Sequence, residues 1–182
     1  QRNITTPIFE PGTIHTTICN STLHELWSYN DQADTIFEYL RDKFRQLAPH
    51  GRLLIRDVVG EDELDEAVYL WLNHEDGESW DAKAPNQNVA SLCTFARFFR
   101  FAQDFLPQRR DATQLPLVPF TAETLAGKSY IVTTMRLAVE YITKKDYTDN
   151  WESEMHEEFA FWSFSEWKAA LRKVGFVVKH AS

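Results

Sequence analysis

A histidine and a carboxylate stand side by side at His24-Glu25, just after an apolar, β-branched run over residues 13–19. That run predicts a buried strand, and Asn20 and Ser21 mark the point where it ends. Open α/β sheets bind ligands at the carboxyl ends of their strands. An imidazole at such an edge suits proton transfer, because its ordinary pKa lies near operating pH. The residues leave a plainer alternative open, in which His24 packs at the strand end and bonds to the backbone.

A strand–helix–strand unit is expected to position this histidine. A helix should run from a cap at Asn30 or Asp31 to about Leu47, and Pro49-His50-Gly51 should end it. The following apolar run, Leu53-Leu54-Ile55, is typical of a strand covered on both faces. Because the two strands should run parallel, both polar strand ends open on one edge of the sheet. Asp57, at the second strand end, could then orient His24 or cap the next segment. The side chains expected on the buried face of the helix are Ile36, Leu40, Phe44 and Leu47.

The central part of the chain, residues 61–159, shows no convincing strand pattern and predicts a helical insertion rich in aromatic side chains. The expected helices cover roughly residues 61–72, 89–106, 121–127 and 130–144. At 144–154, polar groups flank aromatic rings. One interpretation makes Tyr147 and Trp151 part of a substrate-pocket wall. The other makes this stretch a solvated helix junction with both rings anchored in the core.

The last part of the chain predicts a helix and then a strand. Ser163 and Glu166 match a capping box, and Gly175 stands where a glycine commonly ends a helix. The run Phe176-Val177-Val178 is expected to add a strand to the same sheet as the first two.

Composition narrows the classes of function. The chain has 182 residues, enough for one domain with a sizeable core, and 19 basic against 27 acidic residues give a net charge of −8. That charge argues against broad, non-specific binding of nucleic acid. Cys19 and Cys93 lie in apolar segments, which favours buried thiols, a reducing compartment and hence a cytoplasmic location. The sequence shows no apolar run that would span a membrane and no signal peptide. We expect no metal site at His74-Glu75-Asp76 or at His156-Glu157-Glu158, because adjacent ligand types rarely converge on one ion.

Three segments carry a family resemblance. Residues 21–27 read S-T-L-H-E-L-W, residues 47–57 read L-A-P-H-G-R-L-L-I-R-D, and residues 167–176 have the pattern W-x-x-x-L-x-x-x-G-F. In this order they resemble the back half of a class I S-adenosylmethionine-dependent methyltransferase. The first is similar to the Leu-His-Asp-Trp segment of small-molecule O-methyltransferases, and the second to the L-x-P-G-G-x-L-L-I-x-D entry into the fifth strand.

The resemblance implies an α/β fold: a partial Rossmann-like sheet of three or more mostly parallel strands with a large helical insertion. Residues 1–60 and 160–182 would form the core, and 61–159 a lid over the substrate pocket.

The resemblance also assigns roles to residues. His24 would be the general base, with Glu25 as an orienting or coordinating carboxylate and Asp57 as a further catalytic residue. Asn20 and Ser21 would line S-adenosyl-L-methionine, and Trp27, Tyr147 and Trp151 would contact the substrate. No metal is implied.

The chain also departs from the family pattern. Its six glycines never fall at a G-x-G spacing, so the glycine-rich cofactor motif is absent, and His50 replaces the first glycine of the usual Gly-Gly. We therefore expect the C-terminal part of a methyltransferase with an incomplete cofactor site. Its partner would be the missing N-terminal half, or a second copy pairing at the sheet edge.

The expected function is methyl transfer to a hydroxyl or other heteroatom of an unknown substrate. Two alternatives remain open. One is a non-catalytic, methyltransferase-like interaction domain whose open sheet edge pairs with another chain. The other is modification of RNA, with a local basic patch formed by Arg97, Arg100, Arg109 and Arg110.

Overall fold

The computed structural model describes residues 8–81, 83–84, 87–106 and 118–179. The chain divides into two compact units. Unit 1 comprises residues 1–62 and 161–182, and unit 2 comprises residues 63–160. The predicted divisions were at 60/61 and 159/160.

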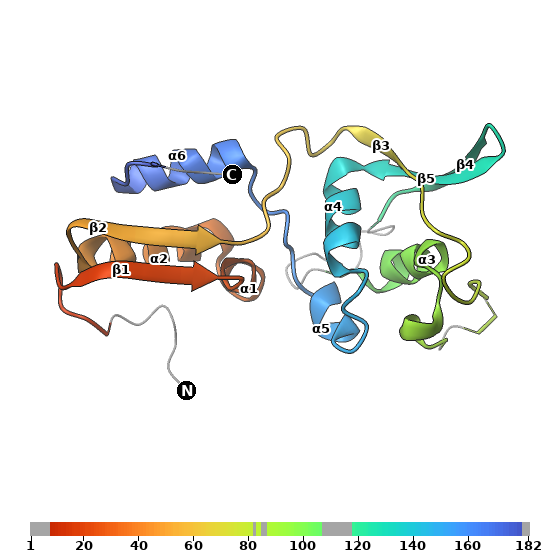
Figure 1. The fold of residues 1–182 in the computed structure, drawn as a ribbon, viewed down its shortest axis with the longest axis horizontal. Coiled ribbons are helices and arrows are strands. Elements are labelled where there is room, and N and C mark those ends of the chain that lie inside the picture. Colours follow the sequence, from red (N-terminus) through yellow and green to blue (C-terminus); the bar gives the residue numbers. More distant parts are fainter. Residues whose placement is uncertain (1–7, 82, 85–86, 107–117, 180–182) are drawn as a thin grey trace. The chain divides into compact units, whose positions relative to one another are not determined.

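Unit 1 is built on two parallel strands, β1 (Ile14–Asn20) and β2 (Leu47–Arg56). Between them the chain forms the helices α1 (Leu23–Tyr29) and α2 (Gln32–Gln46) (Figure 1). The predicted parallel strand–helix–strand unit is therefore confirmed. The pairing is irregular near its start, because Ile14 pairs with Leu47 and Thr16 with Arg52. The intervening residues of β2 bulge around Gly51.

The core of unit 1 lies on one face of this sheet. Cys19, Leu53 and Ile55 pack there with α1, α2 and the closing helix α6 (Phe164–Val174). On the other face, the paired residues Ile18 and Leu54 are 71% and 48% exposed. The expectation that the 53–55 strand is covered on both faces is thus wrong for the described chain. In α2, Ile36 and Leu40 are buried as predicted, whereas Phe44 is largely exposed and Leu47 already belongs to β2.

Helix α6 begins and ends at the predicted residues. Ser163 and Glu166 form the capping box, and Gly175 ends the helix with φ 117°. The expected third strand at 176–178 is wrong, because these residues form no ladder in the described chain. Phe176 instead packs edge-on against Phe44 of α2, with ring centroids 5.0 Å apart. This contact ties the segment to a helix instead of a strand edge. The parallel sheet of the described chain therefore has two strands, not three or more.

Unit 2 contains a three-stranded antiparallel sheet in the order β3-β5-β4 (Figure 1). Its strands are β3 (Ala67–Leu70), β4 (Thr121–Leu125) and β5 (Lys128–Thr134). This sheet corrects the all-helical prediction for 61–159. Val68, Leu70 and Leu72 alternate with exposed residues, and β5 is rich in β-branched side chains, both of which favour strands. A turn with positive φ at Ala126 and Gly127 joins β4 to β5, where a helix was expected.

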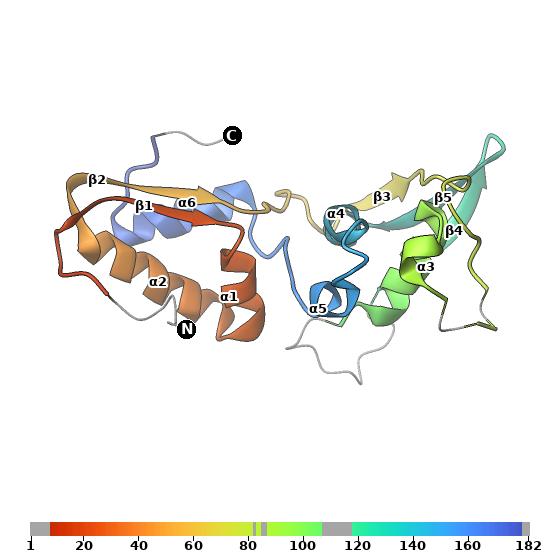
Figure 2. The same ribbon diagram turned by 60° about the horizontal axis from the view of Figure 1, so that its bottom comes forward.

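The helices of unit 2 enclose an aromatic core. They are η1 (Val89–Ser91), α3 (Thr94–Asp104), α4 (Met135–Lys144) and α5 (Trp151–Met155), which Figure 2 shows from a second direction. The predicted helices at 89–106 and 130–144 are thus present in shorter form. Phe98, Phe101 and Phe105 are fully or almost fully buried and pack on Tyr141 and Ile131. Burial of several phenylalanines anchors α3 to the sheet and to α4.

A buried ion pair lies inside this unit. Glu140 and Lys144, one turn apart on α4, bond to each other, and their side chains are 1% and 0% exposed. Glu140 also accepts from the backbone N–H groups of Phe159 (3.1 Å) and Ala160 (2.6 Å). The Lys144 ammonium lies 3.5 Å from the centre of the Phe159 ring. The pair therefore fixes the end of unit 2 against α4.

Within the described ranges, no helix combines the length and the apolar character needed to cross a membrane.

Candidate functional site

The site is built around a short contact between His24 and Asp57. The imidazole Nδ1 of His24 lies 2.6 Å from Oδ1 of Asp57. His24 belongs to the first turn of α1, and Asp57 directly follows β2. The two parallel strands end at the paired residues Asn20 and Arg56, so the pair lies at the carboxyl edge of the sheet. The structure thus brings together two of the predicted site residues that are 33 positions apart in the sequence.

A sharp turn makes this approach possible. Ser21 has φ 48°, in the left-handed region, and its N–H donates to the Arg56 carbonyl at 2.7 Å. A non-glycine residue in this conformation costs about 1 kcal/mol. The turn lets α1 follow β1 with only two residues between them, which places His24 beside the end of β2.

The Asp57 carboxylate accepts four hydrogen bonds. Oδ1 accepts from His24 and from the Val58 N–H at 2.9 Å, and Oδ2 accepts from the N–H groups of Leu23 (2.8 Å) and Thr22 (3.2 Å). The Thr22 side chain makes no capping bond, so Asp57 caps α1 from the neighbouring strand end. The two roles anticipated for Asp57, orienting His24 and capping a segment, are therefore combined in one carboxylate.

Electrostatics fix the protonation of Asp57. Burial raises the pKa of this carboxyl, but the hydrogen bond and charge of His24 and the N–H groups of Val58 and Leu23 outweigh it, so the pKa lies below its ordinary value. An ionised carboxylate can only accept hydrogen bonds. The proton of the His24–Asp57 contact therefore resides on Nδ1, and the lone pair of a neutral imidazole lies on Nε2. The His24 side chain is 9% exposed and that of Asp57 2%, so the carboxylate is the inner member of the pair.

Glu25 and Asn20, also predicted at this edge of the sheet, are more exposed than the His24–Asp57 pair. Glu25 is exposed and follows His24 on α1. Asn20 is exposed, and its Oδ1 accepts from the Arg56 guanidinium at 3.1 Å. The sequence did not suggest this contact between Arg56 and Asn20, although Arg56 directly precedes Asp57. Polar side chains from both strand ends thus lie at the same edge of the sheet as the His24–Asp57 pair.

Trp27, predicted to contact the substrate, packs in the structure against aromatic residues of unit 1. Its ring stacks on Phe161 at 4.5 Å between centroids and meets Trp162 edge-on at 5.6 Å. It is half-buried against the hydrophobic core. Trp27 therefore contributes to the packing of unit 1.

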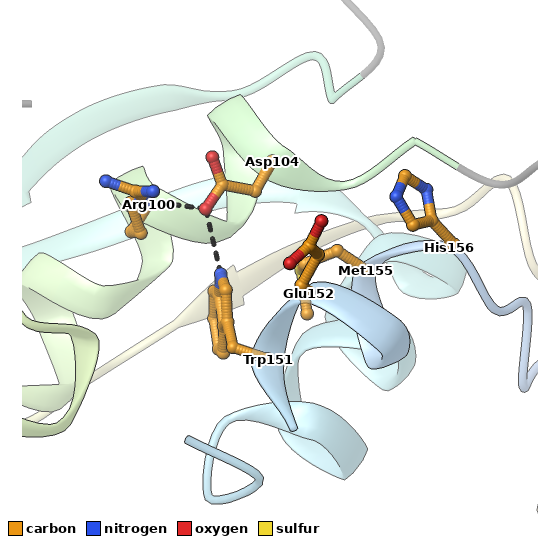
Figure 3. A pocket seen from close by; sticks show the side chains of 6 residues that line it. All are labelled: Arg100, Asp104, Trp151, Glu152, Met155 and His156. Carbon is orange, nitrogen blue, oxygen red and sulfur yellow. Dashed lines mark hydrogen bonds and ion pairs between the residues drawn. The ribbon is translucent and has the colours of Figure 1, made fainter. Parts of the chain in front are cut away.

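Tyr147 and Trp151 belong to unit 2, and their surroundings differ. Tyr147 is 52% exposed, whereas Trp151 is buried and its Nε1 donates to Asp104 at 2.8 Å. The same Asp104 oxygen accepts from Arg100 (Figure 3). Trp151 therefore anchors α5 to α3. The second interpretation of the 144–154 stretch thus agrees with the position of Trp151 but not with that of Tyr147.

Trp151 also borders a cavity of about 330 Å³ in unit 2. Figure 3 shows the lining side chains, which are Arg100, Asp104, Trp151, Glu152, Met155 and His156. The lining mixes one guanidinium with two carboxylates. Sequence reasoning missed this cavity, although Arg100 and Asp104 stand at the i, i+4 spacing of a helical ion pair.

Two of the arginines considered for RNA binding are engaged within unit 2. Arg97 donates to the carbonyls of Val89, Leu92 and Lys145, and Arg100 donates to Asp104. Arg109 and Arg110 lie outside the described residues. Among the described side chains, no three histidines, cysteines or acids converge as metal ligands, and both cysteines are free, buried thiols, as predicted.

Comparison of the chain with protein-family models, with curated proteins and with solved structures finds no match.

Proposed function

We propose that the His24–Asp57 pair is the general base of a methyltransferase that transfers a methyl group from S-adenosylmethionine to a hydroxyl. The observation that carries the proposal is the 2.6 Å contact between Nδ1 and a buried, ionised carboxylate at the carboxyl edge of two parallel strands. The resemblance of the 21–27, 47–57 and 167–176 segments to O-methyltransferases supports the same function.

S-adenosylmethionine, when bound, supplies an electrophilic methyl group on a sulfonium. Methyl transfer would place this methyl carbon on the substrate oxygen and would leave the electron pair of the broken carbon–sulfur bond on sulfur. His24 takes the hydroxyl proton at Nε2, and Asp57 stabilises the resulting imidazolium. Asp57 is thus a positioning residue for His24.

In this proposal, Asn20 and Ser21 line one side of the cofactor. Asn20 is exposed beside the pair, and Ser21 turns the backbone toward it. The glycine-rich turn that would hold the amino-acid part of the cofactor does not occur in this sequence. We therefore propose that a further segment or a second chain completes the cofactor site.

Calorimetry with S-adenosylmethionine tests this function. The chain should bind weakly or not at all, and a longer chain with a glycine-rich strand–turn–helix ahead of residue 1 should bind with measurable affinity. In that longer chain, His24→Gln should lower methyl transfer by a factor of about 10² to 10⁴ without weakening cofactor binding. Glu38→Gln is the matched control, since Glu38 is an exposed acid on α2 with no role in the proposed site. Failure of both chains to bind would exclude the enzyme.

A second candidate is a non-catalytic interaction domain, and the open face of the β1-β2 sheet favours it. Ile18 and Leu54 are exposed there, although parallel sheets are normally covered on both faces. Sedimentation would separate the candidates. A dimer that Ile18→Lys disrupts, without any binding of S-adenosylmethionine, would support the interaction domain.

A further inference from the structure

An exposed aromatic face lies on the antiparallel sheet of unit 2, which Figure 1 shows as β3, β5 and β4. We call the aromatic face the set of Tyr69, Trp71 and Tyr130 together with Lys128. Tyr69 is 53% exposed and Trp71 62%. Large aromatic side chains this exposed on one sheet face are characteristic of binding surfaces.

The strand register explains why these side chains share a face. Tyr69 pairs with Val132, so Tyr130 is its diagonal neighbour on β5. Lys128 lies two residues before Tyr130 on the same strand, and its ammonium is 5.3 Å from the centre of the Trp71 ring. The opposite face carries Leu70 and Ile131, which pack into the core. The sheet therefore buries one face and presents aromatic rings on the other.

The two tyrosine rings do not form one flat platform. Tyr69 and Tyr130 meet at an interplanar angle of 81°, with centroids 6.2 Å apart. A sugar ring or a nucleobase stacks best on a ring that lies flat. Perpendicular rings instead leave ridges and slots of the kind that hold proline rings.

The aromatic face offers three hydrogen-bond donors: the hydroxyls of Tyr69 and Tyr130, which can also accept, and the Nε1–H of Trp71, which can only donate. Within the described chain, the hydroxyls of Tyr69 and Tyr130 and the Nε1–H of Trp71 have no hydrogen-bond partner. Lys128 adds a cation. A ligand that offers carbonyl acceptors and apolar rings can therefore bind to all three donors and to the rings.

A proline-rich segment has these properties. In a polyproline II helix every backbone carbonyl faces solvent, and proline has no N–H. We propose that the aromatic face binds proline-rich peptides in the polyproline II conformation. Nucleic acid fits less well, because the chain carries a net charge of −8 and Glu123 pairs directly with Tyr130 on this sheet. The proposal is independent of the methyl transfer proposed for unit 1.

Indole NMR with a decaproline peptide provides the test. The chain contains six tryptophans, and the indole signal lost in Trp71→Phe identifies Trp71. Adding decaproline should shift this signal and leave the signals of buried Trp151 and Trp167 in place. Trp71→Ala should weaken binding by roughly tenfold or more, and Trp71→Phe, which keeps a ring but loses the donor, by roughly threefold to tenfold. Tyr147→Ala removes an equally exposed ring outside the sheet and should leave binding unchanged.

Three outcomes would overturn the proposal. In the first, decaproline leaves the Trp71 signal in place at millimolar concentration. In the second, Trp71→Ala binds the peptide as well as the unchanged chain does. In the third, a glucose hexasaccharide or a single-stranded DNA decamer shifts the Trp71 signal and decaproline does not.

Discussion

The Nδ1 atom of His24 lies 2.6 Å from Oδ1 of Asp57, although 32 residues separate the two in the chain. The same carboxylate accepts three backbone N–H groups, two of them at the start of α1. One side chain therefore holds the imidazole, caps the helix that carries it, and joins that helix to β2. Asp57 therefore contributes both to the stability of the fold and to the proposed chemistry of His24.

Removing the Asp57 carboxylate should destabilise the protein. Asp57→Ala leaves buried N–H donors without an acceptor, and the expected loss in the free energy of unfolding is about 2–4 kcal/mol. Urea unfolding measures this loss. Glu25→Ala, an exposed acid on the same helix, should change the free energy of unfolding by less than about 0.5 kcal/mol. Equal effects of the two substitutions would contradict the structural role of Asp57.

Asp57 should also make the stability pH-dependent at the acid end. Its folded-state pKa lies below the ordinary value of 3.8, so folding favours the ionised form. The stabilisation is fully present above pH 3.8 and is lost as the pH falls through the lower folded-state pKa. Comparing urea unfolding of the native chain and of Asp57→Asn at several acid pH values tests this. The difference in free energy between them should shrink as the pH falls, and a difference that grows would contradict the sign.

Removing one member of the Glu140–Lys144 pair should lower the free energy of unfolding more than replacing both members does. Lys144→Met leaves the buried Glu140 carboxylate without its cation, and the expected cost is about 3–5 kcal/mol. Combining it with Glu140→Gln removes the uncompensated charge, so the double variant should be more stable than Lys144→Met alone. Urea unfolding of the two single variants and the double variant gives the coupling energy. Strictly additive losses would show that the two side chains do not interact.

Two glycines should respond differently to alanine. Gly127, at φ 76° in the β4–β5 turn, has open space where a Cβ would stand, so Gly127→Ala should cost only the backbone strain of about 1 kcal/mol. Gly175, at φ 117°, would place its Cβ 2.9 Å from the Phe44 ring. Gly175→Ala should therefore lower the midpoint of thermal unfolding further than Gly127→Ala does. A larger loss for Gly127→Ala would contradict the packing of Phe44 on the end of α6.

Local signals in the sequence predicted α2 and α6 and their ends, whereas α1 was not predicted. Ser163, Glu166 and Gly175 act through bonds within a few residues, so the sequence pattern was sufficient for α6. The strand β3 was missed because Leu64, Val68 and Leu72 satisfy a helical spacing as well as an alternating one. The β4–β5 hairpin was missed because its turn residues, Ala126 and Gly127, include no asparagine or aspartate to signal it.

The candidate site was predictable in part. Parallel strands bring their carboxyl ends together, which made a contact between His24 and Asp57 conceivable from connectivity alone. The sequence could not show that Asp57 both orients the histidine and caps a helix. The capping depends on where the backbone N–H groups of Thr22 and Leu23 point. That direction follows from the left-handed turn at Ser21, a conformation that serine rarely adopts and no pattern signals.

The tautomer of His24 tests its proposed role as the general base most directly. Long-range ¹H–¹⁵N NMR of the imidazole ring, with His24→Gln to identify the signals, distinguishes the two nitrogens at neutral pH. We expect a proton on Nδ1, held by Asp57, and an unprotonated Nε2 as the proposed acceptor of the substrate's hydroxyl proton. A ring protonated on Nε2, alone or together with Nδ1, would contradict the assignment of His24 as the general base.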